Sequence, residues 1–476
     1  MIVNGIIMVP IYFKFMPIST YGAWLATGNI VAMLGLVESG FASVITQKMS
    51  VAIVNKDEKH FFQLAGANIY TAILMAIALF ILGLTIFPFV ANWINAEESI
   101  KHSITIAYII SLASAAISLL VSLLGAFPQV WQETKTVGII TTIINILGII
   151  SLVVYLYAGF GVVSLALGYI TRALLNLIGQ GSWIMIKWRK LHLSRPTFNF
   201  KIIKELLKDC FYPFLSRISN VFMGHSQSFI LAMFINPAMA VVYDITSKIA
   251  VVACNFVSMA NGSFFALLSL TFASKDKQEI NRLIKNVSIF FMTVLFSAIL
   301  YSLVFTESIV HFWVGLDKYG GNLLLIVIVI SVLVSQMKNY FNNLLYTGGL
   351  INKSAKLDVL SMILYIILLV SIISFVQIYA IPVATFITSV LFMGLYLKLL
   401  KKDLLVEIQS ILKTILKLTL ISTPFVLLHF FLDVYLLKLP ILLIYGIVFT
   451  LIYSFFIAIS NKEFVKLLIV RFKNGK

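Results

Sequence analysis

The chain has 476 residues, of which 61% are hydrophobic and only 11% are charged, and its mean hydropathy is +1.04. This composition leaves too little polar surface to cover a water-soluble protein of this size, so the natural solvent is a membrane. The formal net charge of +17 is assigned to the lysine and arginine excess that orients helical membrane proteins, and no nucleic-acid partner is expected.

Apolar runs of 18 or more residues recur along the whole sequence, which is typical of membrane-spanning helices. They predict an all-α polytopic membrane protein with about fourteen transmembrane helices. In chain order, we expect helices at 1–13, 20–46, 62–88, 102–127, 137–159, 161–186, 206–233, 237–272, 279–305, 322–347, 355–377, 380–398, 409–432 and 439–460.

The first predicted helix, 1–13, is short. At about 1.5 Å per residue it spans roughly 20 Å of a hydrocarbon core of about 30 Å. The segment lacks a basic region and a small-residue cleavage site, so it does not predict a cleaved signal peptide. We therefore expect either that this helix is incomplete or that the chain begins further upstream.

The basic loops alternate along the chain, which predicts the orientation of the protein in the membrane. Lysines and arginines gather after every second predicted helix, for example at Lys56 and Lys59, whereas the intervening loops carry acids such as Glu97 and Glu98. This pattern predicts a multi-pass membrane protein with both termini in the cytoplasm.

The longest predicted loop, 187–205, divides the chain into related halves. It is basic with an apolar rhythm, so we expect a cytoplasmic linker or an interfacial helix. The predicted domains are an N-lobe at 1–186, a C-lobe at 206–400, and two additional C-terminal helices with a basic tail at 401–476. Tyr21 to Ser50 and Tyr243 to Ser274 resemble each other, so the lobes are expected to be pseudo-symmetric six-helix repeats.

Ionisable residues inside predicted spans are the main candidates for a site, because charge at membrane depth is costly and faces the protein interior or a watery cavity. Most of them are cations, and fixed cations can replace the hydration of an anionic substrate. We expect a substrate-binding cationic cavity from Arg172, Arg217, Lys248, Lys338 and Lys14, with the two arginines favoured for bidentate contacts to an anionic group. The expected coupling or ion-pair residues are Glu38 and Asp244.

Each of these residues has a structural alternative. Asp244 and Lys248 are four residues apart on one helix and can neutralise each other. Glu38 can pair between lobes or couple transport to protons or sodium, and Lys338 can extend to the cytoplasmic interface. The tryptophans, Trp24 among them, lie mostly near span ends and are interpreted as interfacial anchors.

Neither a P-loop nor paired acids in a large external loop occurs, so the sequence does not predict an enzyme. No catalytic residue, metal ligand or cofactor is expected. Cys210 and Cys254 lack the spacing of a metal site or a disulfide framework.

Two segments carry a family resemblance. Residues 13–24, FKFMPISTYGAW, contain a basic residue followed by a Tyr-Gly-hydrophobic-Trp turn, and residues 34–41, LGLVESGF, place an acid just ahead of a glycine. In these features the chain resembles the Wzx-like polysaccharide flippases of the multidrug, oligosaccharidyl-lipid and polysaccharide (MOP) superfamily. The short first helix departs from that pattern.

The resemblance implies a cationic cavity between two lobes and alternating access. The implied function is the export of undecaprenyl-diphosphate-linked oligosaccharides for O-antigen, and hence lipopolysaccharide, or for capsule. The implied partners are the lipid-linked oligosaccharide, membrane lipids and a polysaccharide polymerase. Two alternatives stay open: a drug or organic-cation antiporter of the same superfamily, which would need acids in the cavity, and a membrane polymerase or ligase, which the short external loops disfavour.

Overall fold

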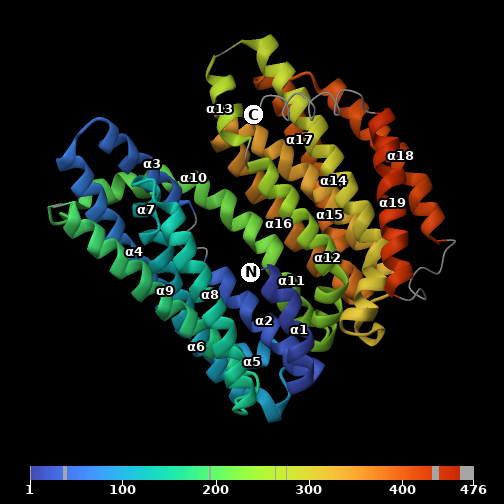
Figure 1. Cartoon of the computed structure of the whole chain (residues 1–476), viewed down its shortest axis with the longest axis horizontal. Helices are drawn as coiled ribbons and strands as arrows, with labels where there is room; N and C mark the ends of the chain where they lie inside the picture. The colour runs from blue at the N-terminus through green and yellow to red at the C-terminus, as the bar shows by residue number, and fades with distance from the viewer. Residues whose placement is uncertain are drawn as a thin grey trace. The chain divides into compact units, whose positions relative to one another are not determined.

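The computed structural model describes residues 2–35, 40–191, 194–262, 264–274, 276–430 and 439–460. Within these ranges the secondary structure is helical and contains no strand (Figure 1). Seven stretches of the described residues are long and apolar enough to cross a membrane, and the longest, Ile351–Asp403, comprises two helices. The prediction of an all-α polytopic membrane protein is confirmed.

The described chain divides into two compact units, which are 1–241 with 358–362, and 242–357 with 363–476. The longer helices of the first unit are α1 (Ile2–Phe15), α2 (Ile18–Leu34), α3 (Phe41–Val54), α4 (Glu58–Ile86), α6 (Glu98–Leu124), α8 (Thr134–Tyr157), α9 (Val163–Lys190), α10 (Phe200–His225) and α11 (Gln227–Phe234). The short helices α5 (Val90–Trp93) and α7 (Ala126–Val130) join them. The division at the 187–205 linker stays a prediction.

The remaining helices begin with α12, which starts in the first unit and continues into the second. They are α12 (Pro237–Gly262), α13 (Phe265–Ser274), α14 (Lys277–Trp313), α15 (Asn322–Thr347), α16 (Ile351–Val376), α17 (Ala380–Asp403), α18 (Ile408–Phe430) and α19 (Leu439–Ser460). One turn of α16 belongs to the first unit. Each predicted span coincides with one of these helices or with two in succession.

Several predicted spans are divided into two helices in the structure. The 20–46 span becomes α2 and α3, the 206–233 span becomes α10 and α11, and the 237–272 span becomes α12 and α13. Before α3, Gly40 adopts φ 89°, a left-handed conformation that glycine tolerates without a steric penalty. A Cβ at Gly40 would also lie 2.9 Å from the Cβ of Pro213 on α10, so close packing requires glycine here.

In the first unit α6 is the central helix, and it packs against α2, α4 and α9, while α8 packs against α9 (Figure 1). Hydrogen bonds tie α6 to α4: Asn68 Nδ2 donates to the Leu123 carbonyl over 3.0 Å, and the Tyr108 hydroxyl donates to the Gly83 carbonyl over 2.8 Å. In an apolar solvent such bonds satisfy polar groups that water cannot reach.

Part of the predicted linker packs against α4 as non-helical backbone. Helix α9 continues to Lys190, and 194–199 is non-helical before α10 begins at Phe200. The Thr197 amide donates to the Phe62 carbonyl over 3.2 Å, and a Cβ at Gly66 would lie 2.1 Å from the Thr197 oxygen. Gly66 therefore lets the non-helical backbone of the linker pack directly on α4.

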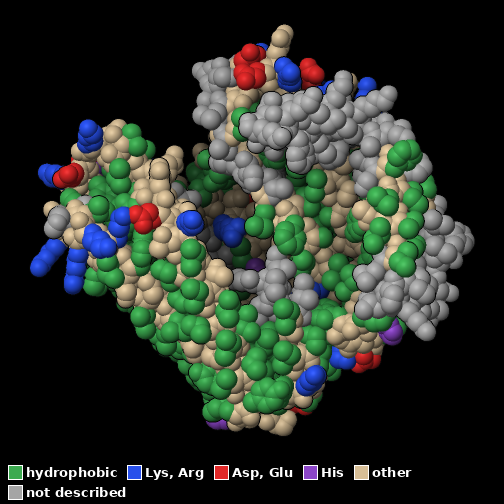
Figure 2. All heavy atoms as spheres, viewed as in Figure 1, with side chains coloured by type: hydrophobic (Ala, Val, Ile, Leu, Met, Phe, Trp, Pro, Cys, Tyr) green, Lys and Arg blue, Asp and Glu red, His purple; other side chains and the backbone are tan. Residues whose placement is uncertain are grey.

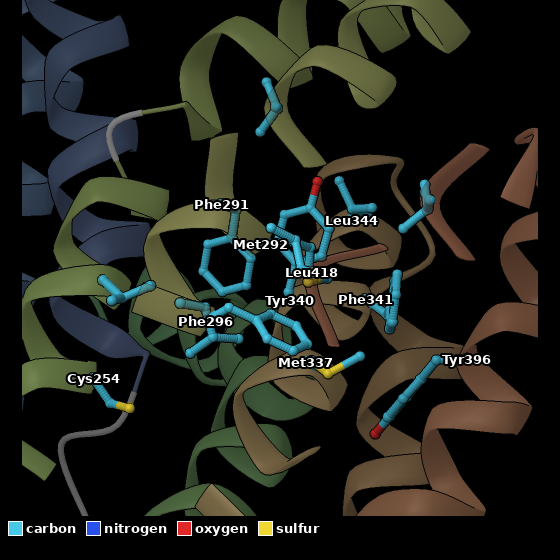
Figure 3. Close-up of a cluster of buried hydrophobic side chains, with 14 of the residues drawn as sticks. Cys254, Phe291, Met292, Phe296, Met337, Tyr340, Phe341, Leu344, Tyr396 and Leu418 are labelled. Carbon is cyan, nitrogen blue, oxygen red and sulfur yellow. The ribbon is translucent and has the colours of Figure 1, made fainter. Parts of the chain in front are cut away.

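The second unit has its own aromatic and aliphatic core, shown in Figure 3. Phe291 and Tyr340 stack with ring centroids 4.4 Å apart, and the Tyr340 hydroxyl forms a 2.7 Å hydrogen bond with Ser288. The C-terminal helices α18 and α19 extend this unit, and α18 packs against α14. Their aromatic contact with α14 consists of Tyr301, Phe305, Phe425, Tyr445, Phe449 and Tyr453.

The outer surface of the first unit is apolar, as contact with lipid requires. On α8, the exposed side chains recur at helical spacing along one face: Ile139, Ile143, Ile146, Ile150 and Val154 are each more than half exposed. An exposed apolar stripe of this kind would promote aggregation in water, whereas lipid chains cover it in a bilayer. Figure 2 shows basic side chains gathered at the end of this unit where α3 lies. The protein is a multi-pass membrane protein.

Candidate functional site

A pocket of about 380 Å³ lies within the first unit, between α2, α6 and α9. This volume is within the range of about 300–1,000 Å³ that is usual for small-ligand sites. The pocket is lined by Trp24, Gly28, Val31, Ala32, Gly35, Ser111, Ser114, Ala115, Ser118, Leu119, Ser122, Tyr169 and Arg172.

Helix α2 contributes the aromatic side chain of Trp24 and two glycines that leave space in the pocket. Trp24, Gly28, Val31 and Gly35 are three or four residues apart, which places them on one face of a helix. A Cβ at Gly28 or Gly35 would meet nothing within 4 Å, so these glycines leave room beside the helix. Gly22 serves a different purpose, because a Cβ there would lie 1.9 Å from the backbone oxygen of Pro237.

Helix α6 contributes hydroxyl groups. Ser111, Ser114, Ser118 and Ser122 occur at intervals of three, four and four residues, so they line one face of α6. Ser111 is 4% exposed, and its Oγ has no hydrogen-bond partner among the described residues. A buried hydroxyl without a partner costs about 1–3 kcal/mol, so it is a notable feature of a pocket wall.

Helix α9 contributes the charge. Tyr169 and Arg172 are three residues apart on one face, and the guanidinium carbon of Arg172 lies 5.0 Å from the Tyr169 ring centroid. Tyr169 also packs against Trp24, with centroids 5.6 Å apart and planes inclined at 34°. The two rings therefore form a continuous aromatic wall with the cation at its edge.

Helix α8 packs against the side chain of Arg172. A Cβ at Gly148 would lie 3.0 Å from Arg172 Cβ and 3.2 Å from its Cγ. The aliphatic stem of Arg172 therefore occupies the space that a side chain at 148 would need. The stem packs on α8 while the residue is half-buried and lines the pocket.

Of the cations predicted to bind substrate, Arg172 is the one that lines this pocket. Arg217, on α10, and Lys14, at the end of α1, belong to the same unit and are exposed. Lys338, on α15 of the second unit, is only 2% exposed, which does not fit a side chain that extends to the interface. That these residues bind substrate together stays a prediction.

The two predicted acids have separate outcomes. Asp244 forms an ion pair with Lys248, one turn later on α12, with Lys248 Nζ 2.8 Å from Asp244 Oδ2. Their side chains are 22% and 19% exposed respectively, so the pair is largely shielded from solvent. Glu38 lies outside the described residues.

Sequence reasoning missed several pocket residues and misjudged Trp24. Trp24 is 4% exposed and lines the pocket, so its interpretation as an interfacial anchor is wrong. It lies close to the start of a span, but the packing of α2 against α6 and α11 encloses it. The serine spacing on α6 was the available signal for the hydroxyl face.

Asp358, at the start of a predicted span, was also missed: it is 1% exposed and accepts a hydrogen bond from Ser216.

The family described as "Polysaccharide biosynthesis protein" matches residues 19–319, which is more than half of the chain. The chain belongs to this family. The matched range includes every residue that lines the pocket. No curated protein matches the chain.

Solved structures share the fold of this family member. An inward-facing MATE family multidrug resistance transporter of the MOP superfamily has a TM-score of 0.67 at 12% identity, over 84% of this chain and 99% of that chain. Lipid II flippase MurJ, in an inward closed conformation, has a TM-score of 0.66 at 14% identity, over 96% and 99%. A mutant of the Vibrio cholerae MATE transporter VcmN has a TM-score of 0.58 at 15% identity, over 84% and 93%.

These likenesses confirm the predicted resemblance to the MOP superfamily at the level of the fold. The family and the proteins with the same fold are polysaccharide biosynthesis proteins, transporters and a flippase. Membership of the family and the serine-lined pocket are the two findings on which a function can be argued.

Proposed function

We propose that this protein is a flippase that moves undecaprenyl-diphosphate-linked oligosaccharide repeat units, of O-antigen or capsule type, from the cytoplasmic to the external leaflet. It acts in the bacterial cytoplasmic membrane with both termini in the cytoplasm. Transport proceeds by alternating access of two lobes, a mechanism suited to a fold built from repeats.

The observation that carries the proposal is the position of Arg172 in a hydroxyl-lined pocket inside an apolar helix bundle. An anionic, sugar-bearing headgroup cannot cross hydrocarbon unless protein groups replace its hydration. A guanidinium supplies charge and directional donors, and serines supply hydroxyls that both donate and accept. Membership of a polysaccharide biosynthesis family agrees with such a substrate.

The antiporter alternative finds less support in the pocket. An organic cation would be stabilised by carboxylates, whereas the lining identified among the described residues contains one arginine and no acid. The proposed partners are the lipid-linked oligosaccharide, membrane lipids and a polysaccharide polymerase that consumes the exported product.

The test is complementation in a host strain that lacks this gene. Arg172→Ala should abolish surface polysaccharide and cause undecaprenyl-linked oligosaccharide to accumulate on the cytoplasmic side, at normal protein abundance. Arg172→Lys should retain partial export, because the charge survives although the planar fork is lost.

Arg189→Ala is the matched control, because Arg189 lies on the same helix but is exposed and outside the pocket. It should export normally. Normal surface polysaccharide in the deletion strain, or normal export by Arg172→Ala at wild-type abundance, would contradict the proposal.

A further inference from the structure

We propose that the first-unit pocket is a glycan subsite, in which Arg172 and the serines donate hydrogen bonds to a sugar ring of the oligosaccharide, while other groups bind the diphosphate. The inference rests on the proposed function and deepens it by assigning the pocket to one part of the substrate. In this role the pocket determines which sugars the protein accepts.

The charge of the lining favours a sugar over a diphosphate. A diphosphate carries about two negative charges and is best held by several charge-assisted donors. The lining found among the described residues offers one cation, Arg172, and four serines. Among the described residues the polar lining therefore consists mainly of hydroxyl groups with a single cation, and two aromatic rings lie beside it.

The aromatic wall suits the apolar face of a pyranose. Trp24 and Tyr169 lie 5.6 Å apart, centroid to centroid, on different helices, so together they present more ring surface than one side chain. The C–H groups on one face of a sugar ring pack on such a surface. The ring hydroxyls, which lie around the rim, are then free to meet polar side chains.

The hydroxyl wall suits that rim. Each serine hydroxyl donates one hydrogen bond and accepts up to two, which matches a sugar hydroxyl in both roles. Four serines line this wall, and Ser111 Oγ has no hydrogen-bond partner among the described residues.

The glycines of α2 provide the space that a sugar ring needs. Positions 28 and 35 line the pocket, and a Cβ at either would contact nothing within 4 Å. A leucine at position 28 can therefore fill the pocket from a helix that otherwise keeps its packing. Gly138, on the exposed face of α8, is also free of neighbours within 4 Å but does not line the pocket, so it is a matched control.

The experiment measures binding to the purified full chain in lipid nanodiscs by calorimetry. The two probes are the oligosaccharide released by mild acid from the host's own surface polysaccharide, and sodium pyrophosphate. We expect Gly28→Leu and Ser114→Leu to weaken oligosaccharide binding at least tenfold and to leave pyrophosphate binding unchanged. Gly138→Leu should bind both probes as the wild type does.

Wild-type oligosaccharide affinity in Gly28→Leu would overturn the inference, and so would loss of pyrophosphate binding in that variant, which would place the diphosphate in the pocket. Absence of oligosaccharide binding to the wild-type chain would overturn it as well. Export in the deletion strain separates this failure from failure of the proposed function. A Gly28→Leu protein that exports normally refutes the glycan subsite, while the flippase proposal stands or falls with the Arg172 variants.

Discussion

The guanidinium carbon of Arg172 lies 5.0 Å from the ring centroid of Tyr169, one turn earlier on the same helix. Cation–π contacts of this kind contribute about 0.5–2 kcal/mol, with the larger values where solvent is excluded. The ring therefore restrains Arg172, the one arginine that lines the pocket in the described part of the chain, and the restraint depends on an aromatic face and not on the phenol oxygen.

This relationship predicts the behaviour of substitutions at position 169. Tyr169→Phe should keep most export, because the ring face is retained, whereas Tyr169→Leu should reduce export severalfold by releasing Arg172 and removing half of the aromatic wall. The measurement is surface polysaccharide normalised to protein abundance. Equal export by the two variants would show that the ring has no part in holding Arg172.

The packing of Arg172 on Gly148 predicts a positional effect from α8. Gly148→Leu should lower thermal stability by the equivalent of about 1–3 kcal/mol, the usual cost of overpacking. Because the clash is with the stem of Arg172, combining it with Arg172→Gly should restore part of the lost stability. The melting temperature in detergent measures both effects, with Gly138→Leu on the same helix as control. Strict additivity of the two changes would argue against the contact.

The Asp244–Lys248 ion pair predicts a stability defect that a double substitution repairs. Removing one partner of a well-buried pair costs about 3–5 kcal/mol, and this pair, which is about one-fifth exposed, should cost less. Asp244→Asn and Lys248→Met should each lower protein abundance in the membrane, and the double variant should recover much of it. Lost export by Lys248→Met at normal abundance would instead assign Lys248 to the substrate.

The alternation of basic loops predicts that residues 97 and 194 lie on opposite sides of the membrane. Cysteines at Glu97 and Ser194, in a chain whose buried Cys210 and Cys254 are replaced by alanine, should show this by labelling with an impermeant maleimide. Position 97 should react in intact spheroplasts, and position 194 only after permeabilisation. Reaction of both from outside would reverse the orientation at one of them.

Local features of the sequence were sufficient to predict the spans. Runs of 18 or more apolar residues have no stable alternative to a helix in hydrocarbon, so the all-α membrane fold follows from composition and length alone. The pairing of Asp244 with Lys248 was equally local, because four residues on a helix bring side chains together without any tertiary contact.

The pocket was decided by tertiary structure. Trp24, Ser111 and Arg172 come from three helices far apart in the chain, and only the packing of α2 and α9 against α6 brings them together. Helical periodicity determines which residues share a face, but it does not determine which face meets which neighbour when nearly every face is apolar. That choice depends on close approaches such as Gly148 against Arg172 and Gly22 against Pro237, where the absence of a side chain sets the distance between helices.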